Sequence, residues 1–151
     1  MICHATIYGI LHAIQVSSCK IINAQLKTEK KRNTTYMIRS AKTWSDAQSY
    51  CRQYYTDLPT IRNSVENNQI NNILLSGYYI WIGLFLDSWE WSDKWILFFR
   101  HWAAVQPSMS SGSDDCVGMS RTNSGRWAQY SCDLQSPFIC HGIYEPIYDM
   151  A

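Results

Sequence analysis

The sequence predicts a single α+β domain in which two helices come first and short antiparallel strands follow. Two helix starts are visible in the first half of the chain, at Thr43 and at Asn63. The second half holds a continuous apolar run over residues 79–86 and a tight turn at residues 123–125 between two strand-like segments. Helices that precede the strands in this way are typical of an α+β architecture with antiparallel pairing.

The first helix is predicted to begin after Thr43, whose hydroxyl can cap it, with an acid, Asp46, at the third position. A short strand over residues 35–38 is predicted to precede this helix. Apolar residues recur at helical spacing along it, namely Ala47, Tyr50, Cys51 and Tyr54. We therefore expect one face of the helix, with Cys51 on or beside it, to face the interior.

The second helix is predicted to begin after Asn63, which can cap it, with Glu66 at the third position. Its inward stripe is expected to consist of Val65, Ile70, Ile73 and Leu74. Gly77 is expected to end the helix, because glycine is common just past a helix C-terminus.

The strands of the second half are predicted from aromatic and branched residues. Residues 79–86 form a continuous apolar run that suits a buried central strand. Residues 89–91 suggest a strand after a turn, residues 116–119 and 126–132 a hairpin, and residues 137–140 a closing strand. Four tryptophans are expected to pack in the core rather than to stack on a ligand: Trp81, Trp91, Trp102 and Trp127.

The size and charge of the chain limit its function class. A chain of 151 residues fits one domain and can bury a core without a metal. With 13 basic and 12 acidic residues, the net charge of +1 gives no field that would attract nucleic acid. The basic cluster of Lys27 and residues 30–32 is interpreted as a solvated linker.

Six cysteines without a C-x-x-C pair favour disulfides and an oxidising compartment over zinc ribbons or redox motifs. Residues 5–16 are mostly apolar, form a segment too short to span a bilayer and are followed by small residues. Residues 1–18 are therefore predicted to be a signal peptide, and the protein is predicted to be secreted and extracellular. His12 and Gln15 interrupt the run and no Lys or Arg precedes it, so a retained, buried N-terminal segment remains the alternative.

The state of two cysteines depends on that cleavage. Removal of residues 1–18 would take away Cys3 and leave Cys19 unpaired, free to form a disulfide-linked dimer, whereas a retained segment would let Cys3 and Cys19 pair. Residues 19–34 are predicted to be a linker with an N-glycosylation acceptor at Asn33, and residues 143–151 a tail. A metal held by Cys3, His4, His12 and Cys19 is not expected, because the spacing is loose.

Several motifs recur in one order between residues 35 and 141. They are Trp44-Ser45-Asp46-Ala47-Gln48-Ser49-Tyr50-Cys51, Tyr55-Thr56-Asp57-Leu58-Pro59-Thr60-Ile61, Trp81-Ile82-Gly83-Leu84, Trp89-Glu90-Trp91-Ser92-Asp93, Asp115-Cys116-Val117, Trp127, Cys132 and Pro137-Phe138-Ile139-Cys140. This region, residues 35–142, resembles a C-type lectin-like domain. The resemblance implies two helices, two small antiparallel sheets and a long loop that carries the ligand site. It also implies disulfides between Cys51 and Cys140 and between Cys116 and Cys132.

In sugar-binding members of that family, calcium is held by a Glu-Pro-Asn or Gln-Pro-Asp triplet, a loop acid and an Asn-Asp pair after a tryptophan. The matching positions here are Gln106-Pro107-Ser108, Asp114 and Ala128-Gln129. The resemblance also implies a cis bond before Pro107. Gln106, Ser108, Asp114 and Gln129 are thus the candidate carbohydrate-binding residues, and Gln106 leans towards galactose-type preference.

Most of the implied calcium ligands have changed. Ca²⁺ takes six to eight oxygens and carboxylates supply most of its affinity, yet of the matched positions Asp114 alone is charged. Asp114 and Gln106 are therefore candidates for weak Ca²⁺ ligands, and a solvated or structural Asp114 is the alternative.

Two functions follow from the resemblance. The first is a secreted lectin that binds glycans or glycoproteins through a degenerate calcium site. The alternative is a calcium-independent lectin-like domain that binds a protein or another non-sugar ligand. An enzyme is not expected, because bridged cysteines are not thiolates and no nucleophile motif appears.

Overall fold

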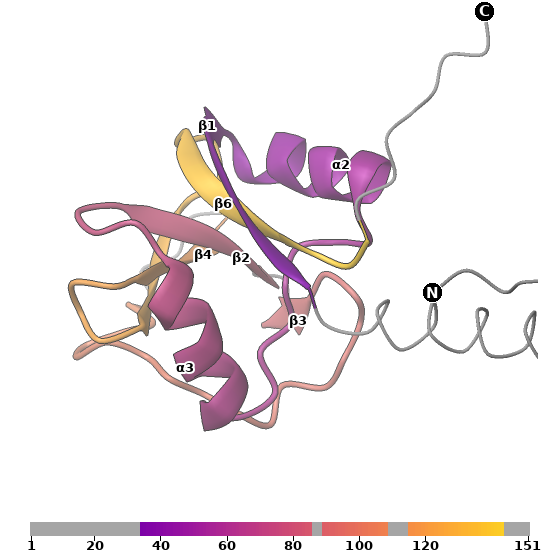
Figure 1. Cartoon of the computed structure of the whole chain (residues 1–151). Coiled ribbons are helices and arrows are strands. Elements are labelled where there is room, and N and C mark those ends of the chain that lie inside the picture. The colour runs from indigo at the N-terminus through magenta and orange to yellow at the C-terminus, as the bar shows by residue number, and fades with distance from the viewer. Residues whose placement is uncertain (1–33, 86–88, 109–114, 144–151) are drawn as a thin grey trace, which may run out of the picture. The chain divides into compact units, whose positions relative to one another are not determined.

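A computed structural model of the chain describes residues 34–85, 89–108 and 115–143. In chain order its elements are β1 (Thr35–Lys42), α2 (Trp44–Tyr54), α3 (Ser64–Ile73), β2 (Tyr79–Phe85), β3 (Glu90–Trp91), β4 (Asp115–Ser120), β5 (Arg126–Ser131) and β6 (Ser136–His141) (Figure 1). The α+β prediction is confirmed, with both helices ahead of most strands. None of the helices in these ranges is long and apolar enough to cross a membrane.

The described strands form one connected sheet in the order β1-β6-β2-β4-β5, with β3 paired to β2. All pairs are antiparallel except β2 with β6, which are parallel and meet at Trp81 and Phe138. The resemblance implied two small antiparallel sheets instead. The parallel contact makes the difference, because it joins the β1–β6 ribbon to the strands around β2.

The sheet carries a hydrophobic core on each face. Side chains alternate along a strand, so Trp81 and Ile82 of β2 belong to different clusters. Trp81 packs with Trp44, Ala47 and Cys51 of α2, whereas Ile82 packs in the cluster that contains Ile70 of α3. Figure 1 shows the two helices as separate layers against the sheet. Each helix therefore covers its own core.

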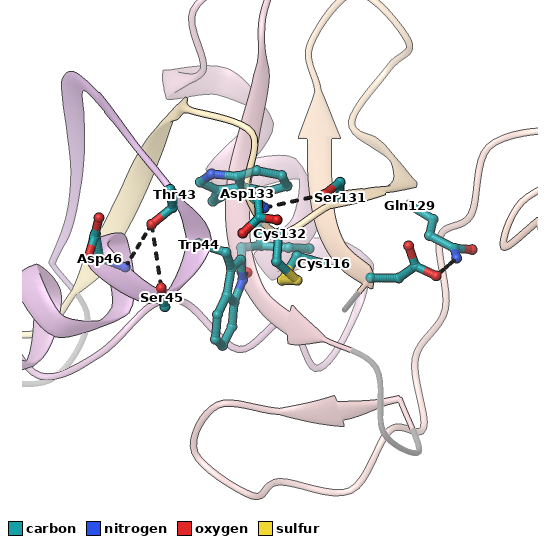
Figure 2. Close-up of a disulfide and its surroundings, with 12 residues drawn as sticks. Thr43, Trp44, Ser45, Asp46, Cys116, Gln129, Ser131, Cys132 and Asp133 are labelled. Carbon is teal, nitrogen blue, oxygen red and sulfur yellow. Dashed lines mark hydrogen bonds between the residues drawn. A yellow bond between two sulfur atoms is a disulfide. The ribbon is translucent and has the colours of Figure 1, made fainter. Parts of the chain in front are cut away.

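Both helices begin where the sequence places them. The Thr43 hydroxyl accepts a hydrogen bond from the Asp46 N–H at 3.3 Å (Figure 2), and the Asn63 side chain accepts one from the Glu66 N–H at 2.9 Å. These side chains satisfy backbone donors that the first helical turn leaves unpaired.

Two predictions about α3 are wrong. The helix ends at Ile73 rather than near Gly77, and its inward face does not include Val65 or Ile73, which are 63% and 41% exposed. Ile70 and Leu74 are buried as predicted, and the polar Asn67 is buried beside them. The buried face of the helix includes the polar side chain of Asn67. A pattern of apolar residues alone does not predict that a polar residue is buried.

Both bridges that the resemblance implied are present. Cys51–Cys140 joins α2 to β6 across a sequence separation of 89, and Cys116–Cys132 joins β4 to the turn after β5 across a separation of 16. The backbone N–H of Trp44 donates to the carbonyl oxygen of Cys132 at 3.0 Å, so the start of α2 lies beside the second bridge (Figure 2). One bridge thus ties α2 to β6, and the other ties β4 to the turn that contacts the start of α2.

The tryptophans fill the core as predicted. Trp81, Trp91 and Trp127 are at most 1% exposed. Trp102 is partly buried, and its ring lies 5.8 Å from that of Trp127 in an edge-on arrangement. Trp127 therefore packs beneath the long loop that follows β3.

Candidate functional site

The long loop after β3 is held against β5 by backbone hydrogen bonds. The Trp127 N–H donates to the carbonyl oxygen of His101, and the Ala103 N–H donates to the carbonyl oxygen of Trp127, both at 2.8 Å. Trp102 and Trp127 form an isolated parallel bridge. Residues 101–103 thus lie along β5 like an additional short strand.

A tight turn then brings Gln106 over the same strand. The Gln106 N–H donates to the carbonyl oxygen of Ala103 at 3.1 Å, and the following Gln106–Pro107 peptide bond is cis. The Gln106 side-chain oxygen accepts a hydrogen bond from the Gln129 backbone N–H at 3.0 Å. The loop is therefore attached to β5 by a side chain as well as by its backbone.

The Gln129 side chain, which is labelled in Figure 2, forms the remaining hydrogen bonds between the loop and the strands. Its oxygen accepts a hydrogen bond from the Ser108 N–H at 3.0 Å and lies 3.4 Å from the Ser108 hydroxyl. Its amide nitrogen donates to the carboxylate of Asp115. We call Gln106, Ser108, Asp115 and Gln129 the amide network. It links the loop, the start of β4 and the middle of β5.

Three of the four candidate binding residues, Gln106, Ser108 and Gln129, come together in this network. The fourth, Asp114, lies outside the described residues, as do Cys3, Cys19 and Asn33. Ala128 is 9% exposed and pairs with Gly118, so its side chain lies on the opposite face of β5 from that of Gln129.

Asp115 is the network residue that the site prediction left out. The register of the hairpin places Val117 opposite Gln129 and Asp115 opposite Ser131. Asp115 is therefore a diagonal cross-strand neighbour of Gln129 on the same face, within reach of a long side chain. Asp115 could have been predicted from the sequence if the strands of the predicted hairpin had been aligned in the correct register.

The described residues of the network do not fit a calcium ion. They bring one carboxylate, where Ca²⁺ requires six to eight oxygens and gains most affinity from charged ones. The side-chain oxygens of Gln106 and Gln129 already accept N–H hydrogen bonds. Within the described ranges, no three His, Cys, Asp or Glu side chains are grouped in a way that could hold a metal.

Tyr130 follows Gln129 on β5 but belongs to the other face. Its pKa is raised, chiefly by burial and also by a hydrogen bond with Tyr79. Its ring packs 4.2 Å from that of Tyr79. This pair stabilises the sheet on the face away from the amide network.

The fold and the network can be compared with known proteins. Residues 40–142 match the family described as the Lectin C-type domain. The chain belongs to the C-type lectin domain family. Its bridges, helices and long loop are thus those of a lectin domain, and the family assignment predicted from the sequence is confirmed.

Relatives of this lectin domain include receptors and single lectins. C-type mannose receptor 2 of Mus musculus is 33% identical over 122 residues, which are 74% of this chain and 8% of the receptor. A lectin of Pleurodeles waltl is 31% identical over 113 residues, 68% of this chain and 66% of that protein. The lectin domain thus spans only a small part of the receptor's length.

Solved structures show the same fold. Human lithostathine superposes with a TM-score of 0.68 at 21% identity, covering 76% of this chain and 85% of that one. The α+β fold of the lectin domain is therefore shared with proteins of low sequence identity.

Proposed function

We propose that this lectin domain is a carbohydrate-binding module that recognises glycans through the amide network without calcium. The observation that carries the proposal is the position of Gln129, whose backbone and side chain contact Gln106, Ser108 and Asp115 together. These hydrogen bonds order the loop before a ligand arrives. A site ordered in advance loses less conformational entropy on binding.

The chemistry of the network suits sugar hydroxyls, which donate and accept hydrogen bonds. Gln106 offers an amide N–H₂ group and Asp115 a second carboxylate oxygen. Ser108 is exposed and the other three are partly buried, so the network is reached from the surface. Gln106 supports galactose-type sugars as the first class to test.

A second candidate function is binding of a protein or another non-sugar ligand. The long loop exposes Trp95, Ile96 and Phe98, which are 50%, 67% and 77% exposed. Exposed neighbouring apolar side chains are typical of interaction surfaces. The alternating Leu97 and Phe99 pack against the core, so the outward direction of Ile96 and Phe98 is fixed.

An extracellular setting fits both functions. The two bridges of the described chain are stable in an oxidising compartment, and the described residues contain no free cysteine. We extend the proposal to secretion of the protein. We also propose that it binds its ligand without catalysis, because members of the lectin domain family are typically not enzymes. Glycosylation at Asn33 and, once residues 1–18 are removed, a disulfide-linked dimer through Cys19 are part of the same proposal.

The test is a glycan array probed with the protein in the presence of Ca²⁺ and of a chelator. We expect binding of galactose-bearing glycans that the chelator leaves unchanged, and loss of that binding in Gln129→Leu. Gln53→Leu is the matched control, because Gln53 is exposed on α2, which covers the other face of the sheet.

Three results would count against the proposal. Binding abolished by the chelator would overturn its calcium-independent form. Binding retained in Gln129→Leu would move the glycan site elsewhere. No glycan binding, together with protein binding that is lost on substitution of Phe98, would favour the second candidate function.

A further inference from the structure

Val105 combines a strained backbone with an exposed side chain. Its φ angle is 57°, in the left-handed region, and its side chain is 93% exposed. A β-branched residue rarely adopts this conformation, because its branched Cβ crowds the backbone. Such strain persists only where the surrounding structure imposes it, and it is concentrated at functional sites.

The residues on either side of Val105 impose this conformation. The Gln106 N–H donates to the carbonyl oxygen of Ala103, which closes a turn with Val105 at its third position. Ala103 is bonded to Trp127, and Gln106 to Gln129, so both ends of the turn are fixed to β5. The turn requires a positive φ, and glycine or asparagine would meet that requirement with less strain.

The Val105 side chain gains almost no packing in return. At 93% exposure it contributes neither to the core nor to the turn. The isopropyl group belongs, however, to the residue directly before Gln106, a member of the amide network. An apolar contact with a bound molecule would account for a valine at this position.

We propose that Val105 is a ligand-contact residue whose isopropyl group packs against the apolar C–H face of a sugar bound at the amide network. The inference rests on the proposed function and adds a contact to the same site. A sugar ring carries hydroxyls around its edge and C–H groups on its faces. The network supplies hydrogen bonds for the hydroxyls, and Val105 supplies apolar surface beside them.

The experiment compares Val105→Gly and Val105→Asn with the unaltered protein. Gly and Asn both tolerate the positive φ, and Asn has nearly the size of Val but is polar. Thermal unfolding and binding to galactose-bearing and mannose-bearing polymers are measured for each. We expect the melting temperature of both variants to rise by about 4 °C. We also expect their affinity for whichever of the two polymers the unaltered protein binds to fall roughly tenfold.

Ser124→Gly is the matched control. Ser124 is exposed, has a φ of 55° and lies in the turn between β4 and β5, at the far end of that hairpin from Asp115. Its replacement relieves the same kind of strain away from the network. We expect a similar rise in melting temperature and unchanged sugar affinity.

The outcomes separate this inference from the proposed function. Unchanged affinity in Val105→Gly, together with lost affinity in Gln129→Leu, would overturn the role of Val105 and leave the network as the site. Tighter binding by Val105→Asn would overturn the apolar contact. If the unaltered protein bound neither polymer nor any glycan on the array, the proposed function would fail and this inference with it.

Discussion

Asn67 of α3 and Trp127 of β5 are joined by a buried hydrogen bond, in which the Trp127 indole N–H donates to the Asn67 side-chain oxygen at 2.9 Å. The Asn67 amide nitrogen in turn donates to the carbonyl oxygen of Gly125 at 3.3 Å. Asn67 is 1% exposed, so water does not replace either partner. Because the next two residues of β5 lead to Gln129, this contact sets α3 against the strand that bears the amide network.

Replacement of Asn67 with alanine is expected to lower the free energy of unfolding by about 2–4 kcal/mol, because the Trp127 N–H and the Gly125 carbonyl lose buried partners. Urea unfolding followed by tryptophan fluorescence measures the change. Asn68→Ala on the exposed side of the same helix is the control and should change stability by less than about 0.5 kcal/mol. Equal losses in the two variants would contradict the role of Asn67.

Asn67 shows which features of the helices could be predicted from the sequence and which could not. The caps at Thr43 and Asn63 depend on local hydrogen bonds, so the helix starts were predictable from neighbouring residues. The buried face of α3 depends on Trp127, which is 60 residues away. A polar residue with a distant partner is indistinguishable in sequence from a polar residue in solvent.

The two disulfides are expected to differ in what their removal changes. In the chain-entropy model, loss of Cys51–Cys140 costs about 4–5 kcal/mol and loss of Cys116–Cys132 about 3 kcal/mol. Cys116–Cys132 joins β4 to the turn directly after β5, and these two strands bear Asp115 and Gln129. We therefore expect Cys116→Ser/Cys132→Ser to weaken sugar binding more, and Cys51→Ser/Cys140→Ser to reduce stability more.

Denaturant unfolding and binding to immobilised glycan measure the two effects for each double variant. Binding is compared under conditions where both variants are folded, as verified by circular dichroism. A larger loss of binding in Cys51→Ser/Cys140→Ser would show that the second bridge does not hold the network.

His141 is expected to make stability depend on pH. Its pKa is lowered, chiefly by burial and then by the nearby Arg62 guanidinium. The unfolded state therefore binds a proton at a higher pH than the folded state does. Stability contributed by neutral His141 is present above the unfolded pKa of about 6.5 and is lost as the pH falls through that value towards the folded pKa.

We expect the unfolding midpoint in urea to decrease between pH 7.5 and 5.5, and to decrease less in His141→Gln. His101→Gln, which changes a histidine of the long loop, is the control. A pH dependence that is identical in the unaltered protein and in His141→Gln would exclude this residue as its source.

Calcium binding is expected to return when charged ligands are restored. The variant Ser108→Asp/Ala128→Asn/Gln129→Asp places carboxylates and an amide at the positions that the family uses. At a Ca²⁺ concentration of 100 times its dissociation constant, binding would stabilise the folded state by about 2.7 kcal/mol. Thermal unfolding with and without Ca²⁺ measures this, and glycan binding is scored in parallel.

The uncharged variant Ser108→Asn/Ala128→Asn/Gln129→Asn is the control for the change in shape, and it should respond little to Ca²⁺. The unaltered protein is expected to show no calcium-dependent shift. If the charged variant also showed none, the placement of the family's ligand positions on residues 106–129 would be wrong.

The sequence identified most of the network but not its internal bonding. Gln106, Ser108 and Gln129 were found because the family's motif occupies those positions. The motif predicts that their oxygens bind a metal or a sugar, whereas the side-chain oxygens of Gln106 and Gln129 accept N–H groups of the protein. The donor that binds each amide oxygen depends on the geometry of the turn at residues 103–106 and on the register of β4 and β5. Composition determines neither the turn geometry nor the register.

The pairing of β1 with β6 has a consequence for how the domain is carried in a longer chain. Thr35, the first residue of β1, is the register partner of His141, the last residue of β6. The polypeptide therefore enters and leaves at the same place, on one edge of the sheet, while β5 and its network belong to the opposite edge. The points where the chain enters β1 and leaves β6 are thus separated from the amide network by the width of the sheet, so a segment tethered at Thr35 or His141 starts away from the face that a glycan would approach.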